Sequence, residues 1–326
     1  MKTFILAGMV ALTATFACGL AFIPFLRRAK AGQPILKYVK EHEKKSGTPT
    51  MGGLFFVLPL AAVFFIFGGG KSRIATVSVA VGLFYMLVGF LDDFLKIKLK
   101  HNEGLKPYQK ITFQTAIAVL CGFFAYVNDL TPMYLPFVKG TADAGVWIIA
   151  IAALSFIAVT NSVNLTDGID GLAGSVSACY LAAVFVLILS ERNFDPHYLK
   201  NEEYDGIFLL IFVTLFAVTG FLLFNVPKAR VFMGDTGSLA LGGVLGAVTV
   251  FSGNVLLMPI IGATFAWSSL SVIIQVARFK RTGRRVFLMA PFHHHLQMKG
   301  LTETQICFYY SVVTVITGLV AVIFYI

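Results

Sequence analysis

The stretch Ile207-Phe-Leu-Leu-Ile-Phe-Val-Thr-Leu-Phe-Ala-Val-Thr-Gly-Phe-Leu-Leu-Phe224 decides the fold class of this chain. It contains no charged side chain, and nearly all of its residues are apolar. A helix rises about 1.5 Å per residue, so the stretch reaches about 27 Å, close to the roughly 30 Å hydrocarbon core of a bilayer. The sequence therefore predicts a membrane-spanning helix here.

The composition extends this prediction to the whole chain. Of the 326 residues, 57% are apolar and 13% are charged, whereas an average soluble domain has about 45–50% and about 25%. A single water-soluble core cannot enclose so much apolar surface, and a disordered chain would be far less hydrophobic. The net charge of +10 is explained by membrane topology and anionic lipid headgroups, so we expect no nucleic-acid partner. Free thiols are expected at the four cysteines, each of which falls in an apolar run: Cys18, Cys121, Cys179 and Cys307.

Ten apolar runs are candidates for membrane spans: residues 4–26, 51–70, 74–91, 111–127, 146–160, 172–189, 207–224, 237–251, 255–277 and 306–326. The fifth and eighth runs are short enough to be re-entrant. With ten spans and an outside N-terminus, most Lys and Arg residues lie in inside loops, as cytoplasmic loops require. If either short run failed to cross, the basic cluster at 278–299 would lie outside. We therefore expect an all-α, polytopic integral membrane protein with ten transmembrane helices, both termini extracytoplasmic and a single domain over residues 1–326.

Four unusual polar segments fall on the predicted cytoplasmic side. They are Leu91-Asp92-Asp93-Phe94, the segment 161–171, the segment 225–238 and Pro291-Phe-His-His-His295. This topology depends on Lys and Arg alone, yet it places all four segments on one face. This agreement predicts that they form one site.

The pair Asp92-Asp93 closes the third span. An acidic pair at the C-terminus of a helix opposes the helix dipole, which argues against a purely structural position. Two neighbouring carboxylates suit a metal ligand beside a general base. A helix-end pair that meets water is the alternative interpretation.

The segment 161–171, expected as the loop between the fifth and sixth spans, carries Asn161, Asn164, Asp167 and Asp170 at intervals of three. Glycines within it would let a ligand approach the backbone. The carboxylates, near the start of the next helix, could bind a cation or the hydroxyls and base of a nucleotide. A plain capping loop is the alternative.

The third segment carries Asp235 shortly before an apolar helix. Asp235 could be an N-cap or a ligand of Mg²⁺, which commonly uses one or two carboxylates together with substrate phosphates. Phe232 offers a flat face for stacking, and Lys228 and Arg230 can attract phosphate.

Three adjacent histidines, His293, His294 and His295, cannot easily converge on one metal ion from a regular helix. In a loop, one or two of them could contact phosphate or accept a proton near neutral pH. The run Lys45-Ser-Gly-Thr-Pro-Thr-Met-Gly-Gly53 suits a turn near phosphate, although it lacks the P-loop pattern.

Together these motifs resemble the polyprenyl-phosphate N-acetylhexosamine-1-phosphate transferase superfamily. The matching pieces are residues 47–53, Asp92-Asp93, 161–171, Asn225, 232–238 and 291–295, and the resemblance extends from end to end. The triple histidine and the run Thr48-Pro-Thr-Met-Gly-Gly53 favour the muramoyl branch over the N-acetylglucosamine branch. One departure is Leu296-Gln297, where an acidic residue is expected soon after the histidines.

The resemblance implies a reaction in peptidoglycan biosynthesis. Undecaprenyl phosphate would attack the β-phosphate of UDP-N-acetylmuramoyl-pentapeptide, so that lipid I forms and UMP leaves, with Mg²⁺ required. The site would lie on the cytoplasmic face of the bacterial plasma membrane, and the family suggests a homodimer, for which the sequence itself gives no argument. A sister enzyme that uses UDP-N-acetylglucosamine is the nearest alternative. A secondary transporter is disfavoured, because no Asp, Glu, Lys, Arg or His falls in the middle of a predicted span.

The resemblance also implies roles for single residues. Asp235 is expected to be the Mg²⁺ ligand, Asp92 the base that prepares the lipid phosphate, and Asp93 a support for the metal or that phosphate. His293 is expected to assist near the phosphates, and Phe232 to stack on uracil. The expected substrate-binding residues are Lys45, Thr50, Asn161, Asn164, Asp167, Asp170, Asn225, Phe232, His294 and His295.

Overall fold

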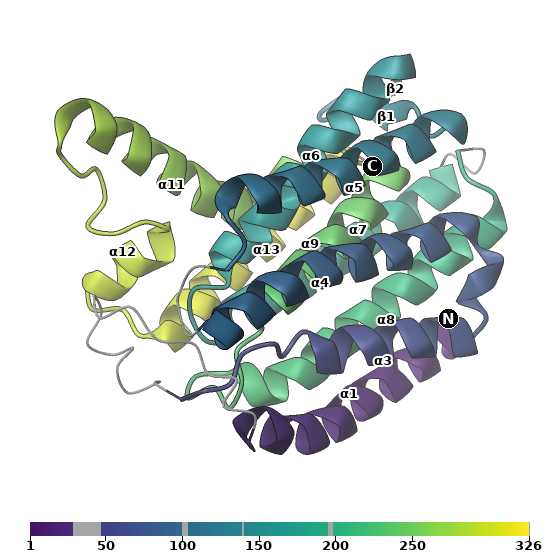
Figure 1. Ribbon diagram of the computed structural model, residues 1–326. Coiled ribbons are helices and arrows are strands. Elements are labelled where there is room, and N and C mark those ends of the chain that lie inside the picture. The colour runs from purple at the N-terminus through teal and green to yellow at the C-terminus, as the bar shows by residue number, and fades with distance from the viewer. Residues whose placement is uncertain (29–46, 100–103, 139, 195–197, 326) are drawn as a thin grey trace.

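The computed structural model describes residues 1–28, 47–99, 104–138, 140–194 and 198–325. Over these residues the chain is mainly helical (Figure 1). The α-helices are α1 (Lys2–Arg28), α3 (Leu54–Ile66), α4 (Arg73–Leu99), α5 (Pro107–Val127), α6 (Ile148–Thr166), α7 (Leu172–Phe194), α8 (Asn201–Asn225), α9 (Gly234–Phe251), α10 (Met258–Ile261), α11 (Ala263–Thr282), α12 (Phe292–Met298) and α13 (Glu303–Tyr325). Single 3₁₀ turns lie at Gly69–Lys71 and Gly145–Trp147, and a short antiparallel hairpin pairs β1 (Pro132–Tyr134) with β2 (Thr141–Asp143).

Eight helices of the described residues are long and apolar enough to cross a membrane: Lys2–Arg28, Arg73–Leu99, Pro107–Val127, Gly145–Thr166, Leu172–Asn193, Asn201–Asn225, Gly234–Phe251 and Glu303–Phe324. A polytopic helical membrane protein is thereby confirmed. Two of the ten predicted runs are not in this set. One is α3, whose 13 residues reach only about 20 Å, and the other is divided between α10 and α11.

Three polar segments that the sequence placed at helix ends or in loops are in fact helical. α6 continues through Asn161 to Thr166, and α4 continues past Asp92-Asp93 to Leu99. The polar side chains of α6 bond to carbonyls of the preceding turn: the hydroxyl of Thr166 donates to the carbonyl of Ser162, and Asn161 Nδ2 donates to the carbonyl of Ile157. Because these bonds satisfy polar groups inside the helix, a polar segment does not end it. The histidine run, expected in a loop, forms α12.

The most enclosed helix is α9, which is buried over nearly its whole length. It packs against α4 on one side and α6 on another. Its glycines allow these close contacts, as small residues do in membrane helix pairs. A Cβ at Gly242, for instance, would lie 2.7 Å from the Cα of Thr160 on α6. The helix that begins with Asp235 is therefore held firmly between two neighbours.

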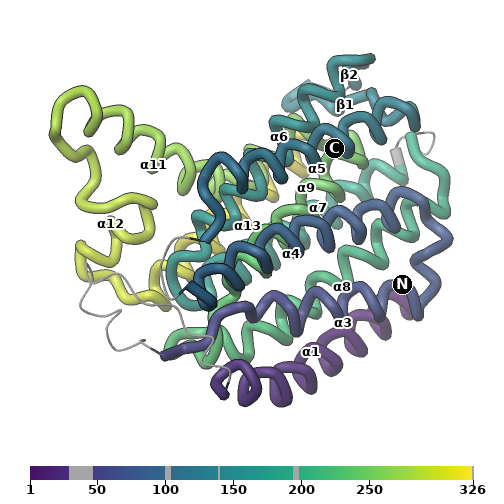
Figure 2. Tube along the Cα trace, in the orientation of Figure 1, coloured from purple at the N-terminus to yellow at the C-terminus, as the bar shows by residue number. Residues whose placement is uncertain are grey.

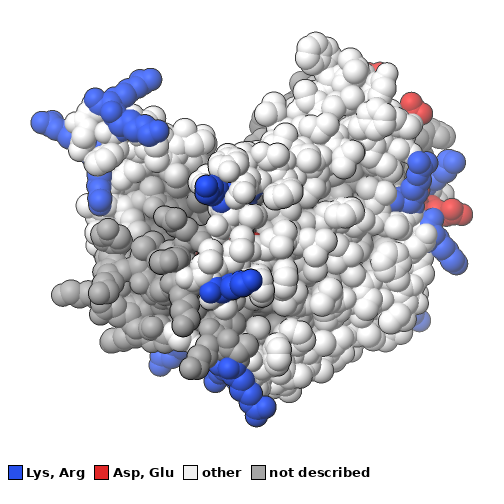
Figure 3. Space-filling model, viewed as in Figure 1, with Lys and Arg blue, Asp and Glu red and all other residues white. Residues whose placement is uncertain are grey.

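One part of the chain leaves the bundle. Figures 1 and 2 show α11 leading away from the other helices and α12 returning toward them. Figure 3 shows Lys and Arg side chains gathered at the tip of this arm, and a broad surface without charged side chains across the middle of the bundle. The N- and C-terminal ends both lie at the end of the bundle remote from α12 (Figure 2).

Candidate active site

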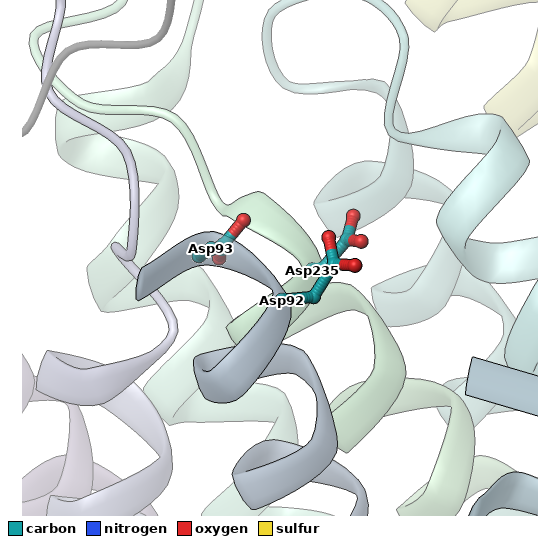
Figure 4. Close-up of side chains that lie close together, drawn as sticks. All are labelled: Asp92, Asp93 and Asp235. Carbon is teal, nitrogen blue, oxygen red and sulfur yellow. The ribbon is translucent and has the colours of Figure 1, made fainter. Parts of the chain in front are cut away.

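Three carboxylates meet where α4 lies against the start of α9. Asp92 and Asp93 come from α4, Asp235 from the first turn of α9, and one oxygen of each lies within 4.8 Å of the others. Figure 4 shows the side chains of Asp92 and Asp235 directed toward one another, with Asp93 beside them on the same turn of α4. The predicted meeting of the Asp92-Asp93 pair with Asp235 is thus confirmed.

Gly89 explains how the two helices come so close. A Cβ at this position would clash with the backbone carbonyl of Asp235 and lie 2.6 Å from the amide nitrogen of Thr236. The contact between α4 and α9 is therefore backbone against backbone. Asp92 and Asp93 follow Gly89 by about one turn, so this contact brings them to the level of Asp235.

Two lysines complete the cluster. Lys96 Nζ lies 2.6 Å from Asp92 Oδ2 and 3.3 Å from Asp235 Oδ2, and Lys110 Nζ lies 2.6 Å from the same Asp235 oxygen. Neither lysine is among the site residues predicted from the sequence. The spacing of Lys96 four residues after Asp92 was a signal that could have identified it, whereas Lys110 reaches Asp235 only through the tertiary fold.

Asp93 is held by the neighbouring helix. Its Oδ2 accepts a hydrogen bond from the backbone N–H of Thr236 at 3.0 Å and another from the Thr236 hydroxyl at 2.7 Å. Gly234, which has a φ of +71°, brings the chain over this carboxylate. A Cβ at Gly234 would lie 2.5 Å from Asp93 Oδ2 and 2.6 Å from Thr50 Oγ1. Thr50, a predicted site residue, therefore borders Asp93.

The end of α6 supplies amide groups. Asn164 Nδ2 donates to Asp235 Oδ1 at 2.7 Å and to Ser238 Oγ at 2.8 Å, so it joins the acidic cluster as predicted. Asn161, about one turn earlier, donates to Gln114 Oε1 at 2.7 Å. This bond joins α6 to α5.

The segment between α6 and α7 carries Asp167. Burial raises the pKa of this carboxyl well above its usual range, and the negative charges of Asp235 and Asp93 raise it further. The next residue, Gly168, lies against α12: a Cβ there would clash with His293 Nε2 and lie 3.1 Å from His294 Nε2. Two of the three histidines therefore meet the segment 161–171, and both are buried.

His295 lies on another side of α12. Its Nδ1 accepts a hydrogen bond from the backbone N–H of Leu288 at 3.1 Å, and its ring stacks on that of Phe292. Burial and the nearby charge of Lys299 lower the pKa of His295, in agreement with an unprotonated Nδ1. The predicted contact of His295 with substrate remains a prediction.

Asp170 and Asn225 fix the segment that leads from α8 to α9. Asp170 Oδ2 accepts a hydrogen bond from the N–H of Ala229. Asn225 Oδ1 accepts from the N–H of Gly171, and its Nδ2 donates to the carbonyl of Val231. Asp170 and Asn225 therefore tie the segment 161–171 to the connection between α8 and α9.

The run before α3 is hydrogen-bonded to the residues that lead into α9. Phe232 N–H donates to the carbonyl of Pro49, and the amides of Gly52 and Gly53 donate to the carbonyls of Phe232 and Met233. A Cβ at Gly53 would clash with the backbone of Gly237. The glycines of this run thus allow it to lie directly beside the start of α9. Lys45, another predicted site residue, lies outside the described residues.

The three carboxylates could hold a divalent metal ion. Their oxygens are hard ligands of the kind that such ions prefer, and they are close enough to share one ion. Lys96 and Lys110 both contact Asp235 Oδ2, so a metal ion would have to take the place of an ammonium group on that oxygen. The grouping of the three carboxylates itself fits a cation site that includes Asp235.

Comparisons with known proteins agree with this geometry. A family model described as glycosyl transferase family 4 matches residues 75–253, and a signature of phospho-N-acetylmuramoyl-pentapeptide-transferase matches residues 45–57. The first match includes all three clustered aspartates, and the second includes the glycine run beside α9.

Three similar proteins carry the name phospho-N-acetylmuramoyl-pentapeptide-transferase. The protein from Clostridium novyi (strain NT) is 38% identical over 325 residues, which cover 98% of this chain and 96% of the relative. The protein from Clostridioides difficile (strain 630) is 38% identical over 324 residues, 97% and 96% of the two chains. That from Thermoanaerobacter sp. (strain X514) is 38% identical over 317 residues, again 97% and 96%. Since these similarities run through nearly the whole of both chains, the chain belongs to the phospho-N-acetylmuramoyl-pentapeptide-transferase family.

Proposed function

We propose that this chain transfers phospho-N-acetylmuramoyl-pentapeptide from its UDP-linked donor to undecaprenyl phosphate, forming lipid I and UMP in peptidoglycan synthesis. Similarity to enzymes of that name over nearly the full length supports the activity. The observation that carries the proposal is the cluster of Asp92, Asp93 and Asp235 at one end of apolar helices. Such a position lets a lipid acceptor and a water-soluble donor reach the same carboxylates.

In the reaction, an oxygen of the lipid phosphate attacks the β-phosphorus of the donor, and the bond from that phosphorus to UMP breaks. Asp92 is the proposed base or orienting group for the lipid phosphate. Lys96 and Lys110, adjacent to Asp92 and Asp235, are placed to contact the phosphates of the substrates. A Mg²⁺ ion held by Asp235 with Asp92 or Asp93 would neutralise the pyrophosphate and the departing UMP.

The donor would bind between α12 and the start of α9. Phe232 is the proposed stacking partner of uracil, and His293 would assist near the phosphates. The remaining substrate-binding residues proposed are Lys45, Thr50, Asn161, Asn164, Asp167, Asp170, Asn225, His294 and His295.

The acceptor chain needs an apolar surface that leads toward this site. A cavity of about 300 Å³ lies between α6, α7, α10 and α11, with Leu154, Val159, Met258 and Phe265 in its lining. Ser162, also in its lining, lies on the same helix as Asn164. We assign this cavity to part of the polyprenyl chain.

The site is proposed to face the cytoplasm, with ten spans and both termini outside. Basic residues support this orientation, because Arg27 and Arg28 end α1, Lys96 and Lys98 lie in the last turn of α4, and Lys280 and Arg281 lie in the last turn of α11. Lys and Arg favour the cytoplasmic side of a membrane protein. The bacterial plasma membrane is the corresponding location, and a homodimer is proposed from the family resemblance alone.

Thin-layer chromatography of lipid products tests the proposed activity. The purified chain in detergent, supplied with undecaprenyl phosphate and radiolabelled UDP-N-acetylmuramoyl-pentapeptide, should form a lipid-linked product only when Mg²⁺ is added. A parallel reaction with UDP-N-acetylglucosamine should give none. Transfer from UDP-N-acetylglucosamine alone would assign the chain to the sister activity instead.

A further inference from the structure

Three side chains form a hydrogen-bonded series from α12 to α13. His294 Nδ1 lies 2.7 Å from Gln297 Oε1, and Gln297 Nε2 donates to Glu303 Oε1 at 3.2 Å. Glu303 is the first residue of α13. The series thus joins a carboxylate on one helix to a buried histidine on another.

The chemistry of these groups fixes the direction of each hydrogen bond. An ionised carboxylate can only accept, so Glu303 requires the amide nitrogen of Gln297 as its partner. The amide oxygen of Gln297 then faces His294, and this oxygen also can only accept. The proton between the two must therefore belong to His294 Nδ1. In the neutral ring, the other nitrogen, Nε2, then carries a lone pair.

That lone pair lies beside the candidate active site. A Cβ at Gly168 would be 3.1 Å from His294 Nε2, and Gly168 follows Asp167 in the segment between α6 and α7. The centroids of the His293 and His294 rings are 4.3 Å apart. The unprotonated nitrogen thus lies where the two histidines contact the segment 161–171.

We propose that Glu303, acting through Gln297, is a positioning residue that holds His294 as the Nδ1-protonated tautomer and presents Nε2 as a hydrogen-bond acceptor to the nucleotide-sugar donor. The identity of the ligand rests on the proposed function, whereas the tautomer does not. An N–H or hydroxyl group of the donor is the matching chemistry. The sequence has Gln297 where an acidic residue was expected after the histidines. In this chain the next helix supplies a carboxylate, that of Glu303. It fixes the orientation of the Gln297 amide, and this amide in turn fixes the tautomer of His294.

The tautomer can be measured without substrate. In the full chain labelled with ¹⁵N-histidine in detergent, two-bond nitrogen–proton spectra assign the protonated nitrogen of His294, with His294→Asn identifying its signals. The neutral Nδ1-protonated form is expected in the unmodified chain. An Nε2-protonated ring or an imidazolium at neutral pH would overturn the proposal.

A pair of exchanged residues tests the role of Glu303. In Glu303→Gln, the new amide can donate or accept, so Gln297 is no longer held in one orientation and His294 should populate both tautomers. The KM for the donor should rise roughly tenfold, as for the loss of one hydrogen bond, with little change in kcat. The double variant Gln297→Glu/Glu303→Gln restores an acceptor next to His294 Nδ1, so it should restore both the tautomer and the KM.

Glu202→Gln, at an exposed first-turn carboxylate of α8, is the matched control. It should change neither the tautomer of His294 nor the KM for the donor. An unchanged tautomer and KM in Glu303→Gln would refute the positioning role. A double variant that stays impaired like Glu303→Gln would also refute it, because a merely structural loss would not be reversed by the exchange. Absence of any transfer by the unmodified chain would reject the proposed function, while the tautomer measurement would still decide the state of His294.

Discussion

Asp93 and Thr236 face each other across the contact between α4 and α9, and a single carboxylate oxygen of Asp93 accepts both the backbone N–H and the hydroxyl of Thr236. Both groups are buried. Thr236, which follows Asp235, therefore fixes the orientation of the Asp93 carboxylate. The part of the cluster on α9 and the part on α4 thus position each other.

Thr236→Val should reduce transfer by about tenfold or more. Valine has nearly the same shape but leaves Asp93 without the hydroxyl donor, and a hydrogen bond to a charged group contributes about 1.5–3 kcal/mol. Initial rates of lipid product formation measure the effect. Thr236→Ser retains the hydroxyl and should keep most of the activity. Equal rates for the valine and serine variants would show that the hydrogen bond from the hydroxyl to Asp93 does not contribute to transfer.

Asp235→Asn should lower transfer by about 100-fold or more while leaving the chain folded. The substitution removes the negative charge that faces Lys96, Lys110 and the proposed metal ion, and loss of one group that stabilises charge typically costs this much. The assay is the chromatographic one, with size-exclusion chromatography in detergent to check the fold.

The control for that variant is Asp205→Asn. Asp205 forms an exposed ion pair with Arg192 on α7, away from the cluster, so its loss should leave the rate within about twofold. Near-normal activity of Asp235→Asn at ordinary Mg²⁺ concentrations would contradict its assignment as the ligand.

Lys110→Gln should lower kcat by roughly 10- to 100-fold, because Asp235 loses the ammonium group at 2.6 Å and the phosphates lose a positive charge nearby. Steady-state kinetics with varied donor concentration separate kcat from KM. Lys98→Gln, at an exposed lysine near the end of α4, carries the same change in net charge. A comparable loss in both variants would point to general charge rather than to this contact.

Gly89→Ala should weaken both the fold and the activity. Its methyl group would clash with the backbone of Asp235, and overpacking of this kind costs about 1–3 kcal/mol. Thermal unfolding in detergent should show a lower midpoint, and transfer should fall because the carboxylates move apart. Gly70→Ala, where the nearest atom would be at 3.5 Å, should change neither; a fully active and stable Gly89→Ala would exclude backbone contact as the source of the site geometry.

Phe232→Ala should mainly raise the KM for the UDP-linked donor. A base that stacks on an aromatic ring gains about 1–3 kcal/mol, which corresponds to a rise of about fivefold or more. Phe232→Tyr keeps the flat face and should preserve the KM. An unchanged KM in the alanine variant would remove the stacking role.

Much of the architecture could be predicted from the sequence because a bilayer imposes a simple pattern. Long uncharged runs such as 207–224 can only be membrane helices, and α8 covers that run. The distribution of Lys and Arg was also enough to predict that Asp92 and Asp235, far apart in the chain, share one end of the bundle.

Other features depended on the tertiary fold. The continuation of α6 through Asn161 and Asn164 follows from side chains that satisfy polar groups within the helix and beside it, which a hydropathy pattern does not register. The part of Lys110 in the cluster depends on the packing of α5, and the different surroundings of His293 and His295 depend on α12 being a helix. These surroundings become visible only in the three-dimensional structure.

The contact of α4 with α9 through Gly89 also bears on how the protein behaves in membranes of different composition. Because peptide groups touch directly there, no flexible rotamer lies between the two halves of the acidic cluster. Thinning or stiffening of the surrounding lipid can tilt the outer helices, whereas the distance between the clustered carboxylates is expected to change little. Temperature-driven remodelling of the bilayer should therefore alter how fast the lipid acceptor arrives more than the chemistry it meets.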